Sequence, residues 1–318
     1  MSRPHGAGSQ SRTVGGQAVI EGVMMRAPEA WAVAVRRPDG TIEAKRNDLP
    51  ALTTRSRAAR TPLIRGMLVL AESLTLGFKA LSWSAEKSAG EEEPVRRGEV
   101  AVTMVIAVVV ALGLFIFLPV FAAGFLSRLI GDSSIVFVFL DGLIRIGLIV
   151  AYIWLIGRSD DIQRVFQYHG AEHKTIHAYE NGDPLEIDAI QRYSPRHPRC
   201  GTSFIVIVAM VAFVVFLALA PLEFFWQVIA RLALIPFIAG LSYEVLKAAA
   251  GRPWLAWASK PGMWIQSITT NEPDDRQVEV AVASLLAALD EDSVAEVRQR
   301  GEIASGALAV HYEEVDDG

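Results

Sequence analysis

The segment from Tyr168 to His177 carries three histidines spaced four residues apart, His169, His173 and His177. In an α-helix, four residues turn about 400°, so these imidazoles lie on one face and drift about 40° per step. Glu172 lies beside them, and His169-x-x-Glu172-His173 has the H-x-x-E-H order of one class of zinc hydrolase. The spacing predicts a metal site, since two histidines one turn apart can bind one ion. A hydrated helix face that happens to carry histidines is the alternative.

A catalytic zinc takes three protein ligands and keeps one position for water, whose pKa it lowers toward neutrality. His169 and His173 are the natural first two ligands. Thiolate and imidazole ligands together favour zinc over magnesium among divalent metals. Glu172 is then the expected general base or acid. The candidates for the third ligand are His177, His197, Cys200 and Glu244.

The polar candidate residues lie between or beside four long apolar segments. The chain has 318 residues, of which 52% are hydrophobic, and no charged side chain lies between Glu99 and Arg128. Three further apolar segments occupy residues 135–156, 203–222 and 226–250. A run of 18 or more apolar residues can cross a hydrocarbon core of about 30 Å. The sequence therefore predicts an integral membrane protein in contact with the lipid bilayer.

Positive charges flank these segments on one side only. The loops at 129–134 and 221–225 carry almost none, so an even number of crossings places both termini and the histidine segment in the cytoplasm. The single cysteine, Cys200, excludes an intramolecular disulfide and fits a reducing compartment. The flanking lysines and arginines are Arg96, Arg97, Arg158, Arg164, Lys174, Arg192, Arg196, Arg199, Lys247, Arg252 and Lys260.

The remaining segments carry weaker signals. Two alternating runs flank the turn residues Pro38-Asp39-Gly40, which indicates a small β unit. Charges seven residues apart make the segment after Leu63 an amphipathic helix at the membrane interface or against the bundle. Ser159-Asp160-Asp161 and Asn181-Gly182 favour a histidine-bearing helix over residues 160–180. A second amphipathic helix is expected at about 277–289.

These observations predict a mainly α membrane protein. It has a four-helix transmembrane bundle, a small cytoplasmic N-terminal β unit and a cytoplasmic His-bearing helix. The expected order is a disordered tail (1–13), the β unit (14–62), an interfacial amphipathic helix with linker (63–98), transmembrane helices 1 and 2 (99–156), a cytoplasmic His/Cys loop (157–202), transmembrane helices 3 and 4 (203–250), and a cytoplasmic C-terminal segment with an amphipathic helix (251–318).

Four stretches of the chain are longer and more specific: GGQAVIEGVMMR at 15–26, YHGAEHK at 168–174, PRCGTSF at 198–204 and QSITTNEP at 266–273. Together they resemble the YqhQ family, a bacterial membrane family of unknown function described as predicted metal-dependent enzymes. The resemblance runs from about Val14 to about Leu289. It implies a bacterial cytoplasmic (inner) membrane location and names no substrate. It also implies that one site contains Glu21, Arg26, His169, Glu172, His173, His197 and Cys200.

Three functions remain open. The first is a zinc-dependent hydrolase acting at the cytoplasmic membrane face on a peptide or a lipid-linked substrate. The second is a non-enzymatic, metal-stabilised membrane scaffold or assembly factor. The third is a transporter with a path lined by Asp141, Arg145 and Glu244, which the absence of broken-helix signals and inverted repeats disfavours. Asp141 and Arg145 are interpreted instead as a structural pair within one helix. Nothing in the sequence indicates nucleic-acid binding, and the oligomeric state is open.

Overall fold

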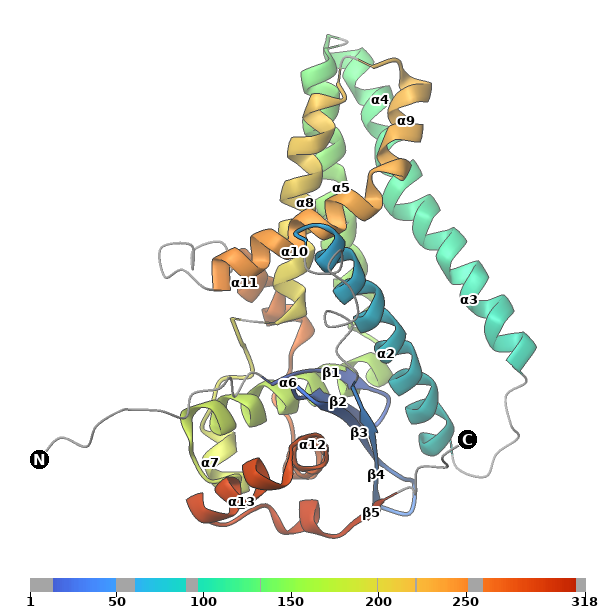
Figure 1. The fold of residues 1–318 in the computed structure, drawn as a ribbon. Helices are drawn as coiled ribbons and strands as arrows, with labels where there is room; N and C mark the ends of the chain where they lie inside the picture. The colour runs from blue at the N-terminus through green and yellow to red at the C-terminus, as the bar shows by residue number, and fades with distance from the viewer. Residues whose placement is uncertain are drawn as a thin grey trace, which may run out of the picture.

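The structure is a computed structural model that describes residues 14–49, 61–89, 97–131, 133–198, 200–220, 222–250 and 260–312. The tail predicted at 1–13, residues 50–60 of the predicted β unit, the linker residues 90–96, and residues 251–259 and 313–318 of the predicted C-terminal segment lie outside the described residues. Within them the chain is mainly helical with one small sheet, as the sequence predicts. The sheet and its helices form one end of the molecule, and a group of long apolar helices forms the other (Figure 1).

The sheet has five strands in the order β1-β2-β3-β4-β5. The first four form an antiparallel meander, and β5 joins it parallel to β4 from the far end of the chain. The turn predicted around Pro38-Asp39-Gly40 is confirmed, and Gly40 adopts the positive φ of 88° that this turn requires. The strands are β1 (Gly15–Val19), β2 (Gly22–Arg26), β3 (Ala30–Arg36), β4 (Ile42–Asp48) and β5 (Val310–Tyr312).

Both faces of the sheet are covered. Side chains alternate between the faces of a strand, so Val33 packs with Leu76 of helix α2 (Ile64–Ser88), whereas Ala34 belongs to the core on the opposite face. Helices α6 (Asp160–Asn181) and α12 (Asp275–Ala288) cover that opposite face. Small alanines on this side let α12 approach the strands closely.

Helix α12 begins with a capping box, in which the Asp274 carboxylate accepts from the Gln277 N–H and the Gln277 side chain accepts from the Asp274 N–H. The sequence predicts an amphipathic helix here, but α12 is buried around most of its circumference. It packs on β2, β3 and β4 as well as on α6. It is therefore the centre of this core rather than a surface helix.

Among the described residues, three helices are long and apolar enough to cross a membrane, or four if one bent pair counts as a single span. The first runs over Val105–Ile130 and joins α3 (Arg97–Leu112), the π-helical turn η2 (Gly113–Phe117) and α4 (Leu118–Ile130). The next two are α5 (Ser134–Ile156) and α8 (Gly201–Ala218). Their positions agree with the first three predicted spans.

The fourth predicted span is not a straight helix. It consists of α9 (Phe224–Ala233) and α10 (Ile235–Ala250), which meet at 51°. Pro236 follows the break directly, and proline has no N–H to continue the helical hydrogen bonds. In Figure 1, α10 runs across the base of the group formed by α4, α5, α8 and α9. This bend contradicts the expectation of four spans without a broken helix.

Helix α2 joins the two ends of the molecule. Near its start Gly66 contacts Gly240 of α10 so closely that a Cβ on Gly66 would lie 2.7 Å from the Gly240 carbonyl oxygen. Its second half packs on the sheet. The shorter elements are α7 (Ile187–Gln191), α11 (Lys260–Thr269), α13 (Glu291–Arg300) and η4 (Ser305–Leu308).

Candidate metal centre

Three side chains from two elements converge at the junction between the sheet and the apolar helices. One ligand atom from each of His169, His173 and Cys200 lies within 4.8 Å of the other two. His169 Nε2 is 3.2 Å from Cys200 Sγ. The histidines lie one turn apart on α6, and Cys200 precedes the first residue of α8. The sequence names all three as candidate ligands, and the fold brings them together.

Backbone carbonyls fix the orientation of both imidazoles. His169 Nδ1 is 2.9 Å from the Thr269 carbonyl oxygen, and His173 Nδ1 is 2.6 Å from the Pro195 carbonyl oxygen. Because a carbonyl oxygen only accepts, each Nδ1 must carry the proton and donate. In the neutral rings each Nε2 therefore offers a lone pair. Metal-binding histidines typically show this arrangement, in which the second ring nitrogen donates to a carbonyl.

Cys200 is the N-cap residue of α8, and its Sγ accepts from the Thr202 N–H at 3.4 Å and the Thr202 hydroxyl at 3.3 Å. Burial raises the pKa of the Cys200 thiol, and the two hydrogen bonds from Thr202 oppose that rise. A coordinated metal deprotonates a thiol outright. Two neutral imidazoles and one thiolate form a donor set suited to zinc.

Glu172 is fully enclosed beside these three residues. Burial raises its pKa to about 8, against the opposing effect of His169 and a hydrogen bond from the Gly16 N–H. One carboxylate oxygen, Oε2, is buried without a hydrogen-bond partner among the described residues. A Cβ at Gly16 would lie 2.5 Å from the Met24 carbonyl oxygen and 3.1 Å from the Glu172 carboxyl carbon. Glycine is therefore required where β1 approaches this carboxylate.

A cavity of about 400 Å³ opens at the site. Strand β1 contributes one wall, and α6 and the start of α8 contribute the others. Besides the three converging residues and Glu172, its lining includes Gln17, Phe166, His197 and Ile205. The cavity gives a small molecule or an extended chain access to the three ligand atoms and to the carboxylate.

The other two candidate histidines, His197 and His177, lie next to the three-residue group without being part of it. The His197 ring centroid is 5.7 Å from that of His173 and 4.4 Å from that of His177. Burial lowers the pKa of His197 to about 4, so the ring is neutral. His177 Nε2 is 3.0 Å from the Arg196 carbonyl oxygen, and its ring stacks on Tyr193 at 5.6 Å. Among the described residues neither belongs to the three-ligand group.

The sequence of the chain matches other sequences over most of its length. The profile of a family described as "Protein of unknown function (DUF1385)" matches residues 61–291, well over half of the chain. The "Uncharacterized protein YqhQ" of Bacillus subtilis (strain 168) is 35% identical over 307 residues, which cover 90% of this chain and 95% of that protein. The chain therefore belongs to the family described as "Protein of unknown function (DUF1385)". No solved structure matches the chain.

The family resemblance implied that Glu21 and Arg26 share the site with the histidines. Glu21, at a positive φ of 52° in the β1–β2 turn, instead forms an ion pair with Arg164 of α6. Arg26 pairs with Glu72 of α2 at 2.8 Å. Both contacts fasten helices to the sheet, and neither residue lines the cavity beside Cys200. A role for either in the site stays a prediction.

Glu244, a candidate third ligand, also forms an ion pair elsewhere. Its carboxylate accepts from Arg65 of α2 at 2.5 Å and 3.2 Å, which ties α10 to α2. Asp141 and Arg145 form the predicted pair within α5, at 3.1 Å. The structure adds a third member, since Arg231 of α9 contacts the same carboxylate at 3.0 Å.

Two residues that hold the surroundings of the site, Gln266 and Gly170, were not among the predicted site residues. Gln266 is fully buried and holds the backbone of His197 by two hydrogen bonds, donating to its carbonyl at 3.0 Å and accepting from its N–H at 2.8 Å. The segment after it crosses α6 at Gly170, where a Cβ would lie 2.0 Å from the Asn271 carbonyl oxygen. Gln266 and Gly170 both lie in the stretches that resemble the YqhQ family, so the resemblance was the signal that could have pointed to them.

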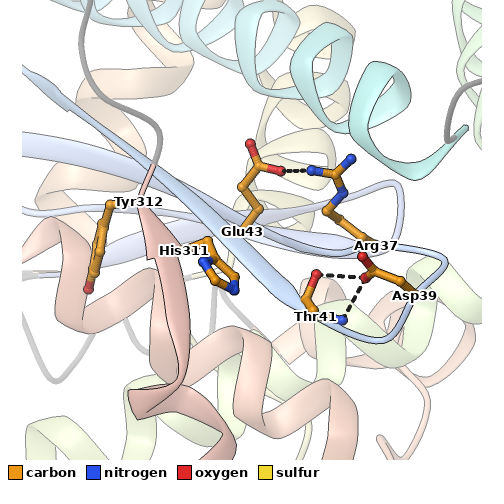
Figure 2. A pocket seen from close by; sticks show the side chains of 6 residues that line it. All are labelled: Arg37, Asp39, Thr41, Glu43, His311 and Tyr312. Atoms are coloured by element: carbon orange, nitrogen blue, oxygen red, sulfur yellow. Dashed lines mark hydrogen bonds and ion pairs between the residues drawn. The ribbon is translucent and has the colours of Figure 1, made fainter.

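A second hollow, of about 390 Å³, lies at the β3–β4 turn beside β5 (Figure 2). Its polar groups bond to one another: Arg37 pairs with Glu43 at 2.7 Å, and Asp39 accepts from the Thr41 hydroxyl at 2.6 Å. These contacts stabilise the turn. The hollow offers no group of three converging ligands among the described residues.

Proposed function

We propose that this protein is a multi-pass membrane protein of the bacterial inner membrane with the sheet, the histidine helix and the C-terminal helices in the cytoplasm. The distribution of lysine and arginine supports this orientation. The fold supports it as well, because α12 packs on the N-terminal strands and on α6. These segments must share one side of the membrane, and α9 with α10 must return the chain to it after α8.

We further propose that His169, His173 and Cys200 hold one divalent metal, zinc. The observation that carries this proposal is the convergence of one ligand atom each from His169, His173 and Cys200 within 4.8 Å, with both Nδ1 atoms hydrogen-bonded to carbonyl oxygens. Zinc bonds of about 2.0–2.3 Å bring ligand atoms to roughly 3.5 Å from one another. The separation of 3.2 Å between His169 Nε2 and Cys200 Sγ is already in this range.

The function that this site supports best is hydrolysis of a peptide or a lipid-linked substrate at the cytoplasmic membrane face. When bound, zinc supplies Lewis-acid activation of water or of a carbonyl group. Glu172 is the proton carrier in this proposal, since its carboxylate lines the cavity beside the three residues and its Oε2 has no hydrogen-bond partner among the described residues. The cavity beside it receives the scissile group, and the adjacent start of α8 keeps a membrane-anchored substrate within reach.

Metal content tests this proposal. The full chain, purified in detergent, is compared with His173→Ala, Cys200→Ser and the neighbouring His177→Ala by plasma mass spectrometry. We expect about one zinc per chain in the wild type and in His177→Ala, and a loss in His173→Ala and Cys200→Ser. A well-folded wild type that takes up no zinc after it is added back would refute the metal site.

A structural metal in a scaffold is the rival outcome. A structural zinc is closed by four protein ligands, and His197, whose ring centroid is 5.7 Å from that of His173, is a candidate for the fourth. Zinc retention in His197→Ala, together with exchange of an exogenous ligand such as thiocyanate at a cobalt-substituted site, supports the open site. Loss of the metal in His197→Ala would favour the scaffold. Cobalt spectra separate the two because a fourth protein ligand blocks the added anion.

A further inference from the structure

Strand β1 is an edge strand, and one of its long sides has no neighbouring strand in the described part of the chain. Its other side pairs with β2 over all five residues. In an antiparallel pair only every second residue exchanges hydrogen bonds with the residue opposite, and the residues between direct their N–H and C=O away from the partner strand. The phase of this alternation in β1 is known, because the Gly16 N–H donates to Glu172 of α6 and not to β2.

Gly16 and Ala18 therefore direct their backbone groups toward the open side of β1. The Gly16 carbonyl and both backbone groups of Ala18 have no backbone partner in another element among the described residues. Gly15 and Gly16 are exposed, and Gln17 and Ala18 are half-buried. The edge thus presents a short row of unpaired donors and acceptors, which is a template for another extended chain.

This open edge forms one wall of the cavity at the proposed metal site. Residues 14–18 line the cavity, and α6 and the start of α8 form its other walls. At about 3.4 Å per residue, these five residues extend over about 14 Å, which matches an extended peptide of about five residues. The volume of about 400 Å³ is that of a small-ligand pocket, so the space suits one added strand and not the sheet of a second copy of this chain.

We infer that the substrate of the proposed metal site is an extended polypeptide segment that pairs with β1 as an added strand. A peptide backbone offers N–H and C=O groups in the two-residue repeat of an edge strand, whereas an acyl chain offers neither. A peptide paired with Ala18 reaches Glu172 about two residues further along, because the Glu172 carboxylate holds the Gly16 N–H. The inference rests on the proposed function, and it selects the peptide from the two proposed substrates.

The cavity walls predict the side chains of the added strand. Successive side chains of a strand point to opposite faces, and Phe166, Ile176 and Ile205 give the cavity apolar walls. The bound segment should therefore carry apolar side chains at every second position. A Cβ at Gly15 would meet nothing within 4 Å, so the described fold does not itself require glycine there. Glycine in a strand often marks the close approach of another backbone.

Retention of peptides by the full chain in detergent tests this inference. The probe is a pool of end-capped hexapeptides with valine, leucine or phenylalanine at every second position, and the chain is first freed of zinc by a chelator so that no peptide is hydrolysed. We expect the chain to retain a subset of the pool, identified by mass spectrometry, because the edge pairs without the metal. Ala18→Pro removes an outward N–H while the hydrogen bonds between β1 and β2 remain, so it should weaken binding about tenfold.

N-methylation of the retained peptides gives a test that does not depend on the folding of a variant. Only every second N–H of an added strand points toward β1. Methylation at these alternate positions should weaken binding by about tenfold or more, and methylation at the positions between them should leave it unchanged. Equal effects at neighbouring positions, or retention of no peptide by the well-folded chain, would overturn the inference.

Zinc content of the same preparation, measured after zinc is added back, separates this inference from the metal site. A chain that binds zinc but retains no peptide would keep the metal site and lose the added strand. A chain that retains peptides with the alternating methylation pattern but binds no zinc would support the strand pairing and refute the metal site.

Discussion

Replacement of Gly170 by alanine tests how the site is assembled. In the interior of an ordinary helix this change stabilises the fold by about 1 kcal/mol, because alanine has the higher helix propensity. Here the new Cβ would lie 2.0 Å from the Asn271 carbonyl oxygen. A normal contact between carbon and oxygen needs about 3.3 Å, so the crossing segment must move by about 1.3 Å.

This movement has a cost that exceeds the gain. Overpacking of a tight contact costs about 1–3 kcal/mol, and the hydrogen bond from the Asn271 N–H to the Phe166 carbonyl oxygen, at 3.0 Å, contributes about 1 kcal/mol more. After subtraction of the helix propensity, the free energy of unfolding should fall by about 1–3 kcal/mol. At about 2–4 °C per kcal/mol, the melting temperature should drop by roughly 2–12 °C.

The same shift reaches the metal site, because the Thr269 carbonyl that orients His169 lies two residues before Asn271. Loss of such a supporting contact typically weakens metal binding by about 10–100-fold. Thermal melting in detergent and competition with a chromophoric zinc chelator measure the two effects. Gly147→Ala on α5 is the matched control, since its Cβ would meet nothing within 4 Å. Melting of Gly170→Ala at or above the wild-type temperature, with unchanged zinc affinity, would refute this reasoning.

Four further substitutions separate ligands, supports and structural ion pairs. Glu172→Gln should keep its zinc within the error of plasma mass spectrometry, because the carboxylate is not one of the three ligands. Gln266→Leu leaves the N–H and carbonyl of the His197 backbone unpaired, so the melting temperature should fall. Zinc affinity should fall as well, because this backbone lies between the Pro195 carbonyl that orients His173 and Cys200. Arg26→Ala should change the free energy of unfolding by less than about 1 kcal/mol, since its partly exposed ion pair with Glu72 is weak. Loss of zinc in this variant would show that Arg26 belongs to the site. Asp274→Ala removes the N-cap of α12 and should lower the free energy of unfolding, measured by denaturant titration, by about 0.5–2 kcal/mol. Asp274→Asn should lower it much less, because asparagine also caps helices well.

Local patterns predicted the parts of the site that lie close together in the sequence. A spacing of four residues places His169 and His173 on one helical face, and the fold retains that face toward the cavity. The choice of Cys200 over His197 and Glu244 as the third residue was not predictable. It depends on how the start of α8 docks against α6, and on the pairing of Glu244 with Arg65, neither of which leaves a periodic signal.

Hydropathy likewise located the apolar helices but not their shape. The break between α9 and α10 depends on Pro236 together with packing against α8 and α2. The burial of α12 was underestimated because its small alanines read as a weak apolar stripe, whereas in the fold they allow close packing on three strands. Strand β5 is too short, at three residues, to stand out from its surroundings in the sequence.

The contribution of both chain ends to one sheet sets the order in which the protein can be built. Strands β1–β4 leave the ribosome first, and α2 follows to cover one of their faces. The other face stays uncovered until α12 has been synthesised, and α12 ends about 240 residues after β4. At about 5–20 residues per second this wait lasts roughly 10–50 s. During that time every described apolar helix is synthesised, and Thr269, whose carbonyl orients His169, is added only near the end of it. The proposed metal site is therefore among the last parts of the molecule to form, after the apolar helices have been synthesised.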